Sequence, residues 1–241
     1  MDASMAGASD PPRRGVWSTW RDILLCSGYP SQVLIAQLLG MAGVRPLLPN
    51  GHLSGTFVFA LSLIDAVVLL SLMLVLLRRR GEHPLRVFFG DRTPSGEVAG
   101  GMLSLPMILF VVIGVTVAIR QFAPALHNVP DNPLEGLVGS GFSRWLFLIV
   151  VIVAGGVREE LQRAFLLHRF RADFGAPWMG LVITSLAFGM GHTLQGLDAA
   201  VITGVLGAIW GAMYLTRGGA LASVVSHSLF NSGELLRIVL Q

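Results

Sequence analysis

The sequence predicts an all-α fold, a polytopic membrane bundle of about seven transmembrane helices. Of its 241 residues, 53% are hydrophobic and only 13% are charged, whereas soluble domains carry about 25% charged residues. The apolar run 57–77 is long enough to cross a bilayer, because a spanning helix needs about 20 apolar residues. All 17 basic residues are arginines that mostly flank such runs, which is typical of topology signals and of contacts with anionic lipid, not of a nucleic-acid patch.

Residues 1–30 are expected to form a cytoplasmic tail and a short helix. The tail is polar, and no compact apolar segment with a cleavage site follows it, so no cleaved signal peptide is expected. Trp17, Trp20 and Leu24 share one helical face, which favours a helix lying at the membrane interface. A core helix is the alternative. The single Cys26 excludes an internal disulfide and a multi-cysteine metal site.

Seven apolar runs are expected to cross the membrane. The first three, with their loops, make up residues 31–141, and the other four make up residues 142–241. They are 31–48, 57–77, 102–119, 142–167, 178–192, 197–215 and 220–240. Asp65 inside the second run is expected to hydrogen-bond a neighbouring helix, and Pro106 is expected to kink the third. With the N-terminus inside, the cytoplasmic segments hold eleven arginines and the outer segments three, which supports this topology.

Four charged residues interrupt the fourth run: Arg158, Glu159, Glu160 and Arg163. One unpaired charge at mid-membrane costs roughly 2.5–3.5 kcal/mol, so these side chains must face other helices or a hydrated cavity. In a regular helix Glu159, Glu160 and Arg163 share one stripe with Gly156, because the spacing is i, i+3, i+4, i+7. The stripe predicts either a functional site or a structural ion pair between Glu159 and Arg163. Arg158 points away from it, and the sequence offers no partner for Arg158.

Three further polar residues, His192, His227 and Asn231, lie in the fifth and seventh runs. If the fourth and fifth runs form a hairpin that turns near Gly175, Glu159 lies 16 residues before the turn and His192 lies 17 after it. At about 1.5 Å rise per residue the two side chains reach nearly the same level. His227 and Asn231 are at i and i+4, on one face of the last helix. A lone histidine is often a packing residue, but this shared level predicts a common hydrated pocket.

These groups form a usable set for hydrolysis. A carboxylate in a site of low dielectric constant can take a proton from water, while a histidine holds that water. A second histidine and an amide can donate hydrogen bonds to the oxyanion of a tetrahedral intermediate. Zinc bound by Glu159, His192 and His227 is the alternative. Because the usual His-Glu-x-x-His motif is absent, this alternative ranks second and no cofactor is expected.

The order of these residues resembles the CPBP family, also called Abi. This family includes the type II CAAX prenyl proteases and bacteriocin-processing or self-immunity proteins. The resemblance covers about residues 142–231 and is carried by Glu159-Glu160 with Arg163, Phe188-x-x-x-His192 and His227-x-x-x-Asn231. It implies a glutamate-dependent intramembrane endopeptidase. By the same resemblance Glu159 and His192 would activate water, His227 and Asn231 would form the oxyanion hole, and Glu160 and Arg163 would support them.

One departure from the family pattern affects the choice of base. Family members usually have three residues between the second glutamate and the arginine, and here only two intervene. Alignment on Arg163 puts Glu159 in the second glutamate's place and Arg158 in the first. Because one residue turns a helix by about 100°, either Glu159 or Glu160 is the candidate base. Glu159 is favoured, since it lies level with His192.

The sequence thus predicts an intramembrane endopeptidase that hydrolyses a peptide bond of a membrane-associated peptide or protein. Its expected location is the cell membrane, with a cytoplasmic N-terminus, and the use of arginine without lysine favours a bacterial inner membrane. Alternatives are a non-enzymatic scaffold or immunity-type partner with the same fold, and a metal-dependent protease. A transporter with a proton relay is a further alternative, but no inverted repeat favours it.

Overall fold

The computed structural model describes residues 15–130, 132–138 and 142–240, so the predicted tail at 1–14 lies outside the described residues. The described chain is helical, apart from turns and one isolated bridge between Leu47 and Leu53. Its helices, in chain order, are α1 (Val16–Leu25), α2 (Tyr29–Met41), α3 (Gly55–Arg79), α4 (Pro84–Phe89), α5 (Pro94–Phe122), η1 (Pro124–Leu126), η2 (Glu135–Leu137), α6 (Phe142–Val150), η3 (Val151–Arg158), α7 (Glu159–Phe174), α8 (Pro177–Met190), η4 (Thr193–Gln195), α9 (Leu197–Arg217) and α10 (Leu221–Leu240).

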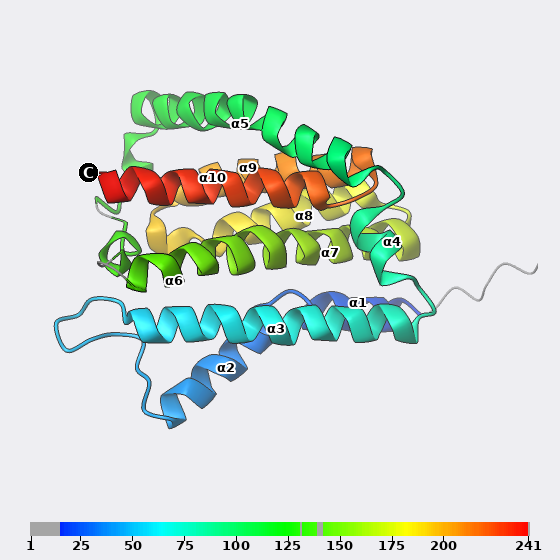
Figure 1. The fold of residues 1–241 in the computed structure, drawn as a ribbon, viewed down its shortest axis with the longest axis horizontal. Helices are drawn as coiled ribbons and strands as arrows, with labels where there is room; N and C mark the ends of the chain where they lie inside the picture. Colours follow the sequence, from blue (N-terminus) through cyan, green and yellow to red (C-terminus); the bar gives the residue numbers. More distant parts are fainter. Residues whose placement is uncertain (1–14, 131, 139–141, 241) are drawn as a thin grey trace, which may run out of the picture.

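Each of the seven predicted runs contains a helix, but the boundaries differ. α5 begins at Pro94, earlier than the predicted start at 102, because proline fits the first helical turn, where its missing N–H is not needed. α4 occupies part of the predicted connector. α7 extends beyond the predicted end at 167, and Gly175, with φ of 66°, ends it in the left-handed conformation that glycine adopts most readily. Pro106 lies inside α5, and Figure 1 shows this helix changing direction along its length.

The predicted span 31–48 is wrong in its extent. α2 ends at Met41, and the chain turns at Gly43, whose φ is 82°. Its 13 residues reach only about 20 Å, less than the roughly 30 Å hydrocarbon core of a bilayer. α1 joins α2 across Gly28 with a bend of 41°, and together the two helices are long and apolar enough for one broken span. α1 lies where an interfacial helix is predicted, and it packs against α7.

The bundle is built around the continuous rod formed by α6, η3 and α7. Figure 1 shows this rod with α3 on one side and α10 on the other, while α5 covers the far side of α10 and α2 is splayed away from the bundle. The α8 and α9 helices pack together beside α7. A buried apolar cluster joins α1, α3, α4, α7 and α9, with Leu69, Met73, Phe165 and Phe170 at its centre.

Ion pairs join α1, α3 and α7 at the end of the bundle that carries Arg80. Arg80 donates to Asp22 and to Asp173, each at 2.8 Å. Glu82, which follows α3, accepts hydrogen bonds from His168 and Arg169 on α7. Burial alone would raise the pKa of Glu82, but the hydrogen bonds from His168 and Arg169 outweigh it and hold that pKa below its ordinary value.

Within the described residues, three helical segments are long and apolar enough to cross a membrane: Gly55–Arg79, Pro84–Phe122 and Leu197–Arg217. The bent pair of α1 and α2 adds a fourth if it forms one span. α8 is apolar but has only 14 residues. An all-α membrane bundle, as predicted, is therefore the architecture of this chain.

Candidate active site

The two adjacent glutamates at the start of α7 have different surroundings. Glu160 is 1% exposed and accepts hydrogen bonds from Arg163 and from Nδ1 of His227, the latter at 2.8 Å. Glu159 keeps 22% of its side chain exposed and lines two cavities. The predicted ion pair between Glu159 and Arg163 is therefore wrong, since Arg163 binds Glu160. Arg163 is free to do so because residues three apart on a helix are neighbours.

His227 on α10 is held in one orientation by three neighbours. Its Nδ1 bonds Glu160, and since an ionised carboxylate can only accept, Nδ1 carries a hydrogen. Its Nε2 lies 3.9 Å from Oε2 of Glu159. The ring stacks on Trp210 of α9, with centroids 3.8 Å apart and planes 14° apart. The sequence reasoning missed Trp210, because an aromatic residue in an apolar run gives no signal of what it will stack on.

His192 lies just beyond the end of α8. Its Nδ1 is 2.8 Å from the carbonyl oxygen of Phe188, one turn earlier. A carbonyl can only accept a hydrogen bond, so Nδ1 donates and the neutral ring has its lone pair on Nε2. The ring of Phe188 packs edge-on against His192, with centroids 4.7 Å apart, and the guanidinium carbon of Arg163 lies 4.6 Å from the same ring. Phe188 thus lies between His192 and the ion pair of Arg163 with Glu160.

Asn231 is one turn beyond His227 on α10. Its Nδ2 is 3.5 Å from the carbonyl oxygen of Val151 in η3. Close packing of α10 on η3 brings it there, because a Cβ built on Gly155 would lie 2.5 Å from Nδ2 of Asn231. The two neighbouring glycines of η3, Gly155 and Gly156, therefore set the distance between the helix of the glutamates and the helix of His227.

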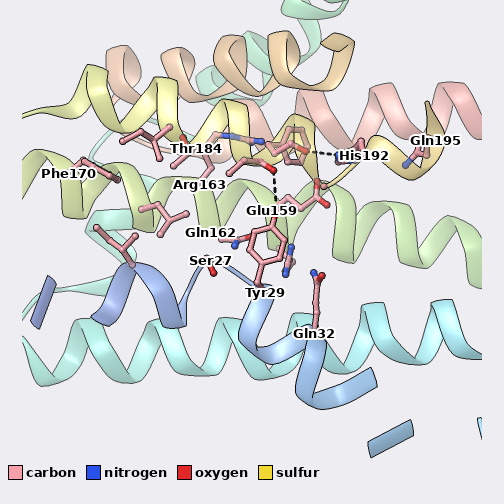
Figure 2. Close-up of a pocket in the computed structure, with 17 residues that line it drawn as sticks. Ser27, Tyr29, Gln32, Glu159, Gln162, Arg163, Phe170, Thr184, His192 and Gln195 are labelled. Atoms are coloured by element: carbon pink, nitrogen blue, oxygen red, sulfur yellow. Dashed lines mark hydrogen bonds between the residues drawn. The ribbon is translucent and has the colours of Figure 1, made fainter. Parts of the chain in front are cut away.

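Two cavities meet at this group of residues. The smaller, about 290 Å³, lies between the α1–α2 turn, α7 and α8. The larger, about 460 Å³, is lined mainly by η3, α9 and α10 and includes His227 and Asn231. Four residues line both cavities: Glu159, Phe188, His192 and Gln195. Figure 2 shows the smaller cavity, with Tyr29 and Gln32 across from Glu159. Of the six predicted residues, Glu159, His192, His227 and Asn231 line the larger cavity together. Arg163 lines the smaller cavity although it is 4% exposed, and Glu160 lines neither.

Arg158, for which the sequence offered no partner, forms a buried ion pair with Asp65 of α3. Asp65 also accepts a hydrogen bond from Ser31 of α2 at 2.5 Å. Asp65 therefore bonds neighbouring helices, as predicted. A Cβ on Gly28 would lie 2.6 Å from Nη2 of Arg158, so the α1–α2 turn also rests on this arginine.

A metal site is not preformed among the residues that the structure describes. No group of three or more histidine, cysteine, aspartate or glutamate side chains there has an arrangement that could hold a metal ion. Glu159, His192 and His227, the predicted ligands of the metal-dependent alternative, are near one another but do not form such a group.

Comparison with known proteins bears on the C-terminal part of the chain. Residues 141–233 match the family model described as "Type II CAAX prenyl endopeptidase Rce1-like". The predicted resemblance to the CPBP family is confirmed. The Rce1-like segment covers nearly the same residues as the sequence motifs and supports a CAAX-type intramembrane protease in general. Together with the apolar helices, it supports a membrane protein. No curated protein and no solved structure gives a significant match.

Proposed function

We propose that the protein hydrolyses a peptide bond of a membrane-associated peptide or protein, with Glu159 as the general base. The observation that carries this proposal is the position of Glu159 where two cavities meet, with His192 on the shared wall and Nε2 of His227 at 3.9 Å. A general base must be reachable by water and by the scissile bond. Glu160 is buried under His227 and Arg163 and is less suited to this role.

In the proposed reaction a water molecule lies between Glu159 and Nε2 of His192. The Glu159 carboxylate accepts a proton from this water while the water oxygen attacks the peptide carbonyl carbon. The tetrahedral intermediate then collapses, the carbon–nitrogen bond breaks, and Glu159 returns the proton to the leaving amine nitrogen. A positioned base of this kind contributes roughly 100- to 10,000-fold to the rate.

The oxyanion of the intermediate would be bound by His227 and Asn231. Nδ2 of Asn231 supplies one N–H donor. Nε2 of His227 supplies the other when both ring nitrogens carry hydrogen, and in that form the Glu160 carboxylate at Nδ1 balances the charge of the ring. Stacking on Trp210 holds the ring in this position. Glu160 would thus act through His227.

Both cavities are lined by polar and apolar side chains, which suggests how a substrate would lie. The smaller cavity presents polar side chains that can hydrogen-bond an extended peptide, among them Gln32, Gln162 and Gln195. The larger cavity is walled mostly by apolar side chains, among them Ile202, Leu206 and Phe230. A substrate with hydrogen-bonding groups and apolar side chains on both sides of the scissile bond fits such cavities.

The substitution Glu159→Gln tests the proposal. We expect it to lower cleavage by roughly 100- to 10,000-fold, because the amide cannot accept the proton from water. Substrates can be found as membrane proteins that stay uncleaved both in a deletion strain and in the Glu159→Gln strain. Cleavage is then measured with the purified protein. Glu135→Gln, a carboxylate that lines neither cavity, is the matched control and should cleave normally.

Two outcomes would point to the alternatives. Normal processing in a Glu159→Gln strain, with the protein at its usual level, would overturn the assignment of the base. If alanine at His192 and His227 also leaves processing intact, the protein acts as a scaffold. Treatment with a zinc chelator should leave activity unchanged, whereas a loss that added zinc restores would favour the metal-dependent reaction.

A further inference from the structure

A groove lies between α1 and the end of α3, apart from the candidate active site. Its volume is about 510 Å³, and its rim and floor differ in chemistry. The polar side chains of its lining, called the rim below, include Ser18, Arg21, Arg79 and Arg80, and the apolar ones, called the floor, are Leu25, Leu72 and Leu76. No residue of this groove lines either of the cavities at the candidate active site.

The rim has a net positive charge. Asp22 is the acidic residue among those that line it, and this side chain is 1% exposed and already bound by two arginines. Arg21 donates to one carboxylate oxygen at 3.0 Å and Arg80 to the other at 2.8 Å. With Asp22 held by these contacts, Arg21 remains 63% exposed and Arg79 is also exposed. Arginine side chains in such a position can bind phosphate oxygens in a bidentate manner.

The leucine floor distinguishes a lipid from a soluble phosphate. Leu72 precedes Arg79 by two turns of α3, about 10 Å along the helix axis. A ligand that contacts both must therefore join a phosphate to a hydrocarbon chain. The outer face of α1 is also apolar, with Trp17 87% exposed and Leu24 61% exposed. Tryptophan side chains are typical of the boundary between headgroups and acyl chains.

We propose that this groove binds the phosphodiester headgroup of an anionic phospholipid. Arg79 and Arg21 hold the phosphate, while an acyl chain lies against Leu25, Leu72 and Leu76. The lipid stabilises the contact between α1 and α3. Because the turn after α1 contributes Ser27 to the smaller cavity, the groove and the candidate active site share one structural element.

Lipid binding to the full-length protein in neutral detergent tests this proposal. Native mass spectrometry measures the affinity for phosphatidylglycerol, and phosphatidylcholine serves as the zwitterionic reference. Arg79→Gln should weaken phosphatidylglycerol binding about fivefold, and Arg21→Gln combined with Arg79→Gln about 25-fold, since each arginine near a lipid surface contributes a factor of about five. Arg78→Gln is the matched control. It removes the same charge from an exposed neighbour on α3 that does not line the groove, so it should have little effect.

The other outcomes overturn the proposal. Equal losses of phosphatidylglycerol affinity in Arg78→Gln and Arg79→Gln would mean that the lipid is attracted to the positive surface in general and does not bind in this groove. Equal affinity for phosphatidylcholine would exclude selection for an anionic headgroup. If inorganic phosphate or a soluble glycerophosphate competes as well as the lipid, the site binds phosphate and the leucine floor has no part in binding. Helical content measured by circular dichroism confirms that the variants are folded, and none of these readouts depends on proteolysis.

Discussion

At the scale of single residues, burial separates two glutamates that the sequence treats alike. Aligning the motif by the glutamates or by the arginine left two candidates for the base. In the structure Glu160 turns toward Arg163 and His227, whereas Glu159 turns toward the two cavities. The difference follows from the rotation of about 100° between successive helical residues. Of two neighbouring carboxylates on one helix, one can therefore hold a histidine while the other faces a cavity at nearly the same level.

The buried pair of Asp65 and Arg158 should be a strong contributor to stability. Asp65→Asn leaves the buried guanidinium without its counter-charge, and breaking such a pair typically costs about 3–5 kcal/mol. We expect a clear loss of thermal stability in detergent, measured by circular dichroism. Asp91→Asn is the control, because Asp91 and its partner Arg86 are both exposed and such pairs contribute about 0–1 kcal/mol. Equal shifts in the two variants would contradict the structural role of Asp65.

At the scale of secondary-structure elements, the contact between η3 and α10 brings the candidate site together. η3 is a π-helical segment directly before Glu159, and π segments widen the turn and often occur at functional sites. Its glycines let α10 approach closely: a Cβ on Gly156 would lie 1.9 Å from Oγ of Ser228 and 3.1 Å from its Cα. Because the second of these atoms is backbone, a side chain at this position would force the two helices apart.

Gly156→Ala should therefore lower both stability and cleavage. The added methyl group displaces α10, which carries His227 and Asn231, from the helix that carries Glu159. Gly114→Ala in α5 is the control: a Cβ there meets nothing within 4 Å, and alanine favours a helix over glycine by about 1 kcal/mol. Combining Gly156→Ala with Ser228→Gly removes the closest contact and should restore part of the activity. Full activity in Gly156→Ala alone would show that this helix contact does not set the site geometry.

At the scale of the whole molecule, the charge distribution and the helices together predict the topology. The helical segments match the seven predicted runs in order, although fewer of the described helices are long and apolar enough to cross a membrane by themselves. The rod of α6, η3 and α7 carries charged residues at its middle, and α8 is short, so neither is both long and apolar enough to cross a membrane as a single helix. Their charges and polar groups are covered by neighbouring helices, which the bundle provides and a single helix cannot.

Labelling of single cysteines in cells tests this topology. Cys26 is buried, and replacing it with alanine gives a background without thiols. In that background we expect a cysteine at His52 or His127 to react with an impermeant reagent in intact cells, because both loops lie on the predicted outer side. A cysteine at Arg92 should react only after the membrane is opened. If the cysteine at position 92 reacts in intact cells, the predicted orientation of the protein in the membrane is wrong.

The sequence by itself determined which segments are apolar helices and which polar residues interrupt them. The length of each hydrophobic run identifies the apolar helices. The polar residues inside them stand out because a charge inside a membrane costs free energy. It also placed Glu159 level with His192, because the rise per residue along two antiparallel helices is fixed. Run length and helical rise are properties of one helix or one hairpin, so both can be predicted from residues that are close in the sequence.

Only the tertiary structure decided which side chains meet. Glu160 bonds His227, which lies 67 residues away in the sequence. Arg158 bonds Asp65, which lies 93 residues away. Helical periodicity gives the face on which a residue lies but not the element that packs against that face. The π segment η3 also breaks the regular period just before the glutamates. Close packing of α10 on the glycines of η3 is therefore what fixes the pairing of glutamate and histidine in this protein.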